Sequence, residues 1–236
     1  MALILILESS TEVCSVALSE GGKLNDLEES GEGLNHSRLL TVFAEKILKR
    51  NRLNPSEVDA FAVSKGPGSY TGLRIGVSAA KGLCFATGKP LLAISTIDAM
   101  ASYLAQHPDE FELALDDSTL ICPMIDARRM EVYHAVYNKL GKVVNPVSAK
   151  IITENSFEEL FKKNRIVFFG NGAVKCRKVI GNTNAVFKGP DKASARFMAS
   201  LAEKYFNSGK YEDVAYFEPF YLKDFIATTP KNKVIK

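Results

Sequence analysis

Residues 66–76 read GPGSYTGLRIG and lie between an apolar segment, residues 60–64, and a run of small residues, 77–87. This order predicts a strand, a tight turn and the start of a helix. Such a turn could present backbone N–H groups to a phosphate at the helix N-terminus. However, a dinucleotide-binding fingerprint needs glycine where Thr71 stands, and both the spacing and the lysine of a P-loop are absent.

Small residues recur along one side of the helix that this stretch begins. Gly72, Gly76 and Ala80 are spaced four residues apart, with Ala79 beside them. Residues at this spacing share one helix face, and side chains this small let another helix approach closely. We therefore favour close packing over phosphate binding as the role of this stretch.

The composition is that of an ordinary globular protein. The chain has 236 residues, 46% of them hydrophobic and 24% charged, enough for one large domain or two small ones. No apolar run approaches the ~20 residues of a membrane helix, and the N-terminal MALILILE lacks the basic region of a signal peptide. The four cysteines are scattered, which indicates core residues in a reducing cytoplasm. A net charge of +3 is too small to indicate a nucleic-acid-binding protein.

A polar, irregular segment at residues 107–118 divides the chain into two halves. It contains Pro108 and a concentration of acidic residues, as boundaries between structural units often do. We predict an N-terminal lobe at residues 1–107 and a C-terminal lobe at residues 108–236.

The two halves begin with the same pattern. The apolar residues 4–7 end at Glu8 and are followed by a polar turn and an alternating strand; residues 121–125, Asp126 and the segment after it repeat this order. The repeat is too long for a solenoid unit. It predicts a duplicated α/β protein in which each lobe opens with a β-hairpin.

Two lobes that each open with an acid-tipped hairpin resemble the superfold of actin, heat-shock chaperone ATPases and sugar kinases (the ASKHA fold), whose two hairpin turns hold the ATP phosphates. Four segments together resemble the bacterial TsaB family, also called YeaZ, and they extend over nearly the whole chain. These segments are residues 7–18 (LESSTEVCSVAL), 66–76, 125–133 (IDARRMEVY) and 219–223 (PFYLK).

The resemblance implies a role in making N6-threonylcarbamoyladenosine, the modified base beside the anticodon of tRNA. In that family the catalytic, metal-carrying subunit is a larger paralogue, TsaD, and an ATPase, TsaE, joins the pair. By resemblance this chain is a non-catalytic but required partner without a cofactor of its own. It is expected to form a homodimer when alone, and to meet tRNA through the complex.

The histidines do not suggest a metal site or a catalytic centre. A helix-borne His-x-x-x-His pair, which the catalytic paralogue uses, would place two imidazoles on one face. Here His36, His107 and His134 are far apart in the sequence, and the H-E-x-x-H pattern of a metallopeptidase is absent. We predict no catalytic and no metal-binding residue, with a peptidase as a remote alternative.

A second alternative is an independent nucleotide-using enzyme of the ASKHA type. Hydroxyls in the first turn could bond a phosphate, and the acids of both turns stand where the superfold has its own. The second turn, residues 127–130, contains no glycine that would let the backbone curl around a phosphate. Weak nucleotide binding therefore stays open, while efficient phosphoryl transfer is not expected. The residues concerned are Glu8, Ser9, Ser10, Thr11, Asp126, Gly170 and Gly172.

If the chain works by pairing, two helices are candidates for the interface. The apolar residues of the segment 37–50 fall on one helical face, and the helix after residue 72 has its small-residue stripe. Two antiparallel copies would form a four-helix contact, in a homodimer or with a paralogue. The predicted interface residues are Leu39, Leu40, Phe43, Ile47, Gly72, Arg74, Gly76, Ala79 and Ala80. A bulky residue at Gly76 is then expected to disrupt association and to leave the monomer folded.

Overall fold

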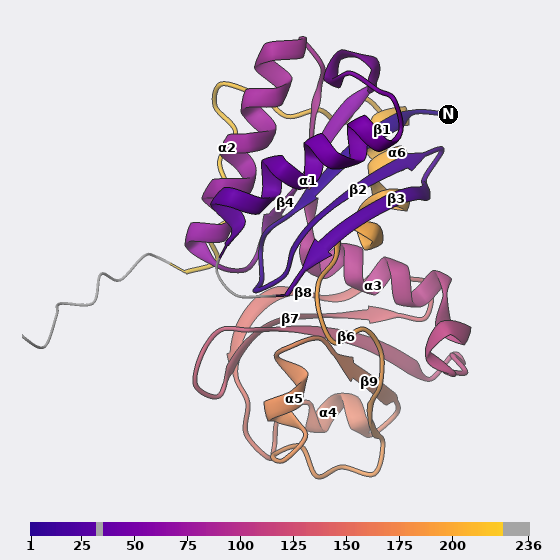
Figure 1. The fold of residues 1–236 in the computed structure, drawn as a ribbon. Coiled ribbons are helices and arrows are strands. Elements are labelled where there is room, and N and C mark those ends of the chain that lie inside the picture. The colour runs from indigo at the N-terminus through magenta and orange to yellow at the C-terminus, as the bar shows by residue number, and fades with distance from the viewer. Residues whose placement is uncertain (32–34, 224–236) are drawn as a thin grey trace, which may run out of the picture.

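The computed structural model describes residues 1–31 and 35–223, which form two α/β lobes, one above the other in Figure 1. The first lobe is built on a five-stranded sheet with the strand order β3-β2-β1-β4-β5. Its elements are β1 (Leu3–Glu8), β2 (Cys14–Glu20), β3 (Lys23–Ser30), α1 (His36–Arg50), η1 (Pro55–Glu57), β4 (Ala60–Gly66), α2 (Tyr70–Thr87), β5 (Leu91–Ser95) and α3 (Thr96–Gln106).

The second sheet has the strand order β10-β9-β6-β7-β8. Read in reverse, this order has the same arrangement of strands as the first sheet. In both sheets the first strand of the lobe is central, antiparallel to the next strand and parallel to the fourth. The elements from residue 108 onward are η2 (Pro108–Phe111), β6 (Thr119–Asp126), β7 (Glu131–Asn138), β8 (Val143–Ile151), α4 (Glu158–Phe161), β9 (Arg165–Phe169), α5 (Ala173–Cys176), β10 (Ala185–Phe187), η3 (Ala195–Met198) and α6 (Ala199–Asn207). The matching orders support the two-lobe α/β architecture of the ASKHA fold.

The apolar run at the N-terminus forms the central strand of the first sheet because both of its faces are buried. Ile4 and Ile6 point into a core that both lobes share, and Leu5 and Leu7 point into a core beneath α1 and α2. A strand buried on both sides requires continuous apolar residues, as the sequence has here.

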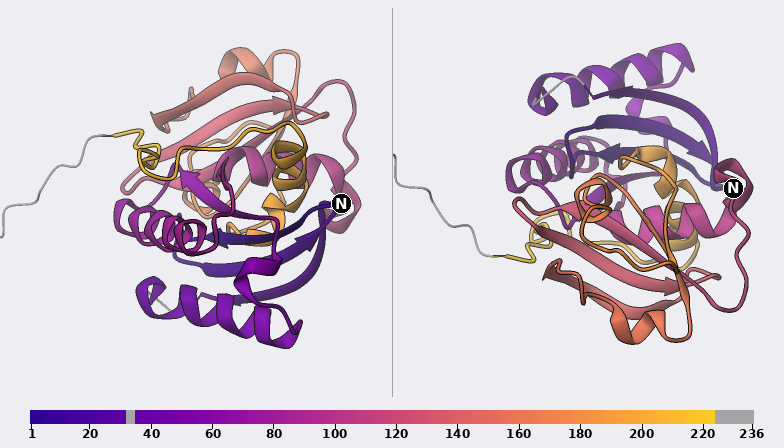
Figure 2. Two further views of the ribbon diagram at one scale, coloured as in Figure 1. Left: turned by 90° about the horizontal axis from the view of Figure 1, so that it is seen from above. Right: turned by 90° about the horizontal axis from the view of Figure 1, so that it is seen from below.

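Figure 2 shows the layers in turn: α1 and α2, the first sheet, α3 and α6, and the second sheet. The layer of α3, η3 and α6 packs between the sheets, where Met100, Met198 and Ala202 meet Ile121 and Phe169. The two lobes therefore share one hydrophobic core.

The end of the described chain returns to the first lobe. Helix α6 packs on β1 and β5, Glu212 forms a β-bridge with Leu91, and Phe217 packs against the core beneath α1 and α2. A division at residue 107 thus separates the two sheets, but it does not separate all the segments that pack on each of them.

The outer face of the second sheet carries less cover than that of the first. Between β8 and β9 the chain forms only the four-residue α4, where the first lobe has the fifteen-residue α1. Phe157, Phe161 and Phe168 fill the core on this side. In the described part of the chain no helix is long and apolar enough to span a membrane.

Candidate functional site

The stretch at residues 66–76 forms the predicted strand, turn and helix start. Strand β4 ends at Gly66, and α2 begins after Ser69, whose hydroxyl accepts a hydrogen bond from the Gly72 N–H at 3.2 Å. This cap satisfies one of the free N–H groups of the first helical turn. The helix starts earlier than the small-residue run alone indicated.

Three glycines of this stretch pack on the polar turn that follows β1. A methyl group at Gly68 would lie 2.1 Å from the Ser10 carbonyl oxygen, and one at Gly72 would lie 2.2 Å from the Ser9 carbonyl oxygen. At Gly76 it would lie 2.1 Å from the Ser9 hydroxyl oxygen. The prediction of close packing is correct, but the neighbour is the turn after β1 in the same lobe and not another helix. A bulky residue at Gly76 would therefore disturb the monomer, contrary to the sequence-based expectation.

This packing closes the first turn. Ser9, Ser10 and Thr11 are all buried, and the Ser69 N–H donates to the Ser10 carbonyl oxygen at 2.6 Å. The Ser9 hydroxyl oxygen has no hydrogen-bond partner among the described residues. The hydroxyls that could have bonded a phosphate are thus covered by the start of α2.

Glu8 lies behind the same turn and is completely buried. Its carboxylate accepts hydrogen bonds from the Ser10 N–H at 2.6 Å and from the Thr96 hydroxyl at 3.3 Å. Burial raises the pKa of Glu8 above its ordinary value, and these hydrogen bonds offset part of that rise. Glu8 is therefore held inside the lobe by hydrogen bonds from its own turn and from α3.

The second turn is held by a cation from α5. The Lys175 ammonium forms an ion pair with Asp126 and donates to the carbonyl oxygens of Arg129 at 2.6 Å and Glu131 at 2.7 Å. Arg128 and Arg129 have φ angles of +70° and +49°, which residues with side chains seldom adopt. Lys175 thus pairs with the Asp126 carboxylate and holds the backbone of the turn.

Asn171 joins the turns of the two lobes. Its side-chain oxygen accepts from the Asp126 N–H at 3.0 Å, and its amide donates to the Glu12 carboxylate at 2.7 Å. The flanking glycines pack on β6: a methyl at Gly170 would lie 2.4 Å from the Met124 carbonyl oxygen, and one at Gly172 would lie 2.8 Å from the Ile125 carbonyl carbon. These glycines serve close packing on β6. The sequence reading missed Glu12, Asn171 and Lys175, because polar residues at such turns carry no spacing signal.

Most of the predicted interface residues are buried inside the first lobe of the chain itself. Leu40, Phe43, Ile47, Gly72, Gly76 and Ala80 are all buried within the first lobe. Leu39 and Ala79 are half-buried against the same core, and Arg74 alone of the set is exposed. The two predicted helices exist, but the predicted face is wrong, because each helix must bury its apolar side on its own sheet.

The face of α2 that does not pack on the first sheet is exposed to solvent, and we call its row of exposed residues the α2 stripe. It consists of Thr71, Arg74, Ser78, Gly82 and Phe85, all exposed. These residues are three or four positions apart and so share a face. The Phe85 ring is 88% exposed, and a methyl at Gly82 would meet no described atom within 4 Å. The same spacing rule applied to the other side of the helix would have found it.

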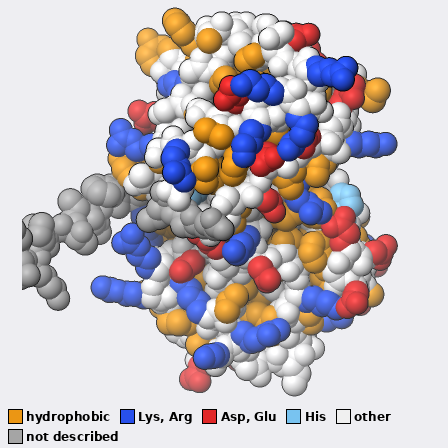
Figure 3. Space-filling model, in the orientation of Figure 1, with side chains coloured by type: hydrophobic (Ala, Val, Ile, Leu, Met, Phe, Trp, Pro, Cys, Tyr) orange, Lys and Arg blue, Asp and Glu red, His pale blue; other side chains and the backbone are white. Residues whose placement is uncertain are grey.

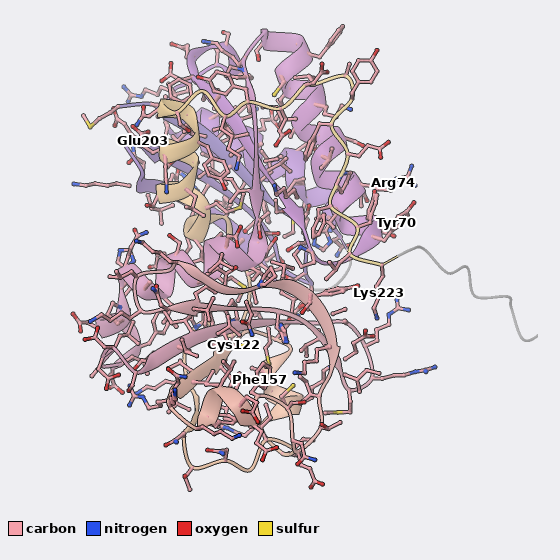
Figure 4. The ribbon with its side chains drawn as sticks, turned by 180° about the vertical axis from the view of Figure 1, so that it is seen from behind. Tyr70, Arg74, Cys122, Phe157, Glu203 and Lys223 are labelled. Atoms are coloured by element: carbon pink, nitrogen blue, oxygen red, sulfur yellow. The ribbon has the colours of Figure 1, made fainter. Side chains whose placement is uncertain are left out.

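The last described residues form a strap beside α2. The Lys81 ammonium donates to the carbonyl oxygens of Ala215 at 2.9 Å and Phe217 at 3.2 Å, and the rings of Tyr70 and Tyr221 lie 4.8 Å apart. Figure 4 shows Tyr70, Arg74 and Lys223 together where the described chain ends. Lys223 forms an ion pair with Glu131, so the strap connects α2 with the second lobe.

The three histidines lie in different environments. The His36 ring meets the Val13 carbonyl oxygen at 3.3 Å, and His107 stacks on Tyr103 with the ring centroids 4.4 Å apart. His134 is buried on β7, and neither of its ring nitrogens has a hydrogen-bond partner among the described residues. Within the same part of the chain, no group of three or more His, Cys, Asp or Glu side chains could hold a metal ion.

The chain is similar to proteins of threonylcarbamoyladenosine biosynthesis. The family model described as TsaD, tRNA N6-adenosine threonylcarbamoyltransferase, matches residues 33–231. A Haemophilus influenzae protein, "tRNA threonylcarbamoyladenosine biosynthesis protein TsaB", is 38% identical over 55% of this chain and 51% of its own length. An Escherichia coli protein of the same description is 28% identical over 95% of this chain and 96% of its own length.

A solved structure agrees with the fold along almost the whole chain. It is a Pseudomonas aeruginosa protein described as similar to the peptidase YeaZ, with 25% identity and a TM-score of 0.79. The match covers 94% of this chain and 100% of that one. The similarity thus includes both lobes and not the N-terminal sheet alone.

Proposed function

The chain belongs to the TsaB (YeaZ) family, and from this premise we propose that it serves tRNA N6-threonylcarbamoyladenosine biosynthesis as a non-catalytic partner of a TsaD-like paralogue. The observation that carries the proposal is the state of the two turns between the lobes. Groups of the chain itself occupy both: the start of α2 covers the first, and Lys175 holds the second. Because groups of the chain itself fill both turns, we infer that this fold serves to pair with another subunit and not to bind a nucleotide.

The α2 stripe is the surface proposed for pairing. Ser78 and Gly82 are small enough for a partner helix to approach closely, and Phe85 is an exposed aromatic side chain of the kind that dominates binding energy. Arg74 at the other end can pair with an acidic residue. Because a TsaD-like paralogue has a similar shape, the same stripe serves a heterodimer and, when the chain is alone, a homodimer.

In this proposal tRNA and a TsaE-like ATPase join through the complex. The chain has a net charge of only +3, and basic and acidic side chains are interspersed on the face in Figure 3. Unassisted nucleic-acid binding depends on a concentrated basic surface. No specific observation favours an independent kinase or a peptidase, so neither is carried further as a candidate function.

The pairing surface is tested by size-exclusion chromatography with light scattering of the chain mixed with its TsaD-like paralogue. We expect Gly82→Trp to weaken the complex at least tenfold, because the indole ring occupies the space of the partner helix. Gly181→Trp is the matched control, since a methyl at Gly181 also meets no described atom within 4 Å. An undiminished complex with Gly82→Trp contradicts the proposed surface.

The absence of catalysis is tested separately. The isolated chain is expected to show no ATP turnover and no binding of tRNA at physiological salt, while tRNA modification by the paralogue and the ATPase is expected to require it. Micromolar ATP affinity with turnover by the chain alone would support the enzyme alternative instead.

A further inference from the structure

A hollow of about 370 Å³ lies on the outer face of the second sheet. In the first lobe α1 covers the corresponding strands, β2 and β3, whereas the second lobe has only α4 at this position in the chain. The hollow is lined by polar side chains of β7, β8, the segment before α4 and the start of α4, together with the apolar side chains of Phe157 and Leu160. They include His134, Asn145, Lys150, Asn155, Phe157 and Glu158. The second sheet thus has a depression with both polar and apolar walls where α1 covers the first sheet.

His134 is the most unusual group in this depression. Its side chain is 5% exposed and projects from β7 on the same side as Val132 and Val136, which belong to the outer core. Both ring nitrogens lack a hydrogen-bond partner among the described residues. Buried polar groups are nearly always hydrogen-bonded, so an imidazole without any partner needs an explanation. A ligand that supplies the missing hydrogen bond is one.

Lys150 and Glu158 line the hollow without pairing with each other. The Lys150 ammonium lies 4.7 Å from the centroid of the Phe157 ring, and no carboxylate of the described residues is within 4 Å of it. Glu158 likewise has no cation among those residues at that distance, whereas its neighbour Glu159 pairs with Lys162. A free cation and a free anion therefore face one cavity.

The Phe157 ring packs against His134. The two ring centroids are 5.3 Å apart, and the buried Phe157 ring is in contact with both the imidazole and the Lys150 ammonium. The φ angle of Phe157 is +68°, a left-handed value that is strained for an aromatic residue. Figure 4 shows Phe157 in the second lobe, below Cys122. The imidazole and the Phe157 ring both line the hollow.

We propose that the hollow binds a small zwitterion of the α-amino-acid class. Its carboxylate pairs with Lys150, its ammonium group pairs with Glu158, and a polar side chain reaches His134, all of which line the hollow. A phosphate is a poor fit, because the hollow offers one lysine beside the carboxylates of Glu158 and Glu159. An apolar ligand would leave the imidazole, the ammonium and the carboxylate unpaired.

The first test titrates amino acids into the full chain and follows the imidazole signals by NMR, with the His134 signal identified from its loss in His134→Asn. The probes are glycine, L-serine, L-glutamine and L-phenylalanine. We expect a saturable shift of the His134 signal with at least one of them. Acetate and ethanolamine each carry half of the zwitterion and are expected to bind at least tenfold more weakly. Failure of all four probes, or equal binding of acetate, overturns the proposal.

The second test assigns the contacts. Lys150→Met and Glu158→Gln are each expected to weaken binding about tenfold, because each removes one charge-assisted contact. Lys163→Met and Glu154→Gln are matched controls, since both residues are exposed and neither lines the hollow. Thermal unfolding of each variant verifies that the lobe is folded. Unchanged affinity in both lining variants overturns the assignment, and the titrations of the unmodified chain remain decisive if a variant fails to fold. A positive result is independent of pairing through the α2 stripe.

Discussion

At the scale of single residues, the glycines of the 66–76 stretch determine how close α2 lies to β1. The Cβ positions of Gly72 and Gly76 are occupied by atoms of Ser9, and at Gly72 the obstructing atom is a backbone oxygen. A backbone oxygen at the end of a central strand cannot move aside as a flexible side chain can. The absence of a side chain is therefore a steric requirement at this position.

Gly72→Ala is expected to lower the free energy of unfolding by about 3 kcal/mol or more, because overpacking of this kind costs 1–3 kcal/mol even where the neighbours can shift. Urea unfolding followed by circular dichroism measures the change. Gly82→Ala in the same helix is the control: the site is open, and alanine favours a helix by about 1 kcal/mol over glycine. Equal stability of the two variants would contradict the close packing seen at Gly72.

Glu8 gives a pH-dependent prediction. Because burial raises its pKa, the folded state holds this proton more tightly than the unfolded state does. Its contribution to stability is complete below the ordinary value of 4.5 and is lost as the pH rises through the folded-state pKa. Glu8→Gln removes the titration and can keep the hydrogen bond from the Ser10 N–H.

The stability of Glu8→Gln relative to the parent is therefore expected to increase with pH above this value, with a slope of at most about 1.4 kcal/mol per pH unit. Unfolding measured from pH 4 to pH 8 for both proteins gives the difference directly, and groups common to both cancel. A difference that decreases with pH would show that the pKa of Glu8 is lowered and not raised.

At the scale of elements, the second turn depends on α5, although the two are far apart in sequence. Lys175 supplies the hydrogen bonds that hold the left-handed residues Arg128 and Arg129 between β6 and β7. Lys175→Met is expected to destabilise the protein by about 1–2 kcal/mol and to speed amide exchange in residues 127–131. Hydrogen exchange read by mass spectrometry measures this, with the exposed Lys178→Met as the control. An unchanged rate of amide exchange in residues 127–131 would mean that the turn is stable without Lys175.

The elements also show where sequence patterns suffice. Helix α3 begins at Thr96 after the Ser95 cap and ends at Gln106, as its cap and apolar spacing predict. Strand β8 was not predicted, because Pro146 lies within it and proline interrupts the strand pattern. The structure tolerates it because β8 is the edge of its sheet, where one row of N–H groups needs no partner strand.

At the scale of the whole molecule, the shared core makes the lobes depend on each other. Met198 is completely buried between them in a layer with residues of both sheets. We expect one calorimetric unfolding transition whose van't Hoff and calorimetric enthalpies agree. Met198→Ala is expected to shift this single transition downward, by about 2–5 kcal/mol of stability, whereas Val174→Ala at an exposed site leaves it in place. Two separate transitions would show that the lobes unfold independently.

The sequence by itself determined the strand-turn-helix at residues 60–87, the central strands, the two-lobe plan and the family resemblance. Each of these rests on local periodicity or on a motif that is contiguous in the chain. Only the tertiary structure decided which face of α2 is free, that Gly72 and Gly76 meet Ser9, that Asn171 joins the two turns and that Lys175 holds the second one. These features depend on contacts between distant segments, and a helix with small residues on two sides does not reveal from its spacing which side its own sheet will bury.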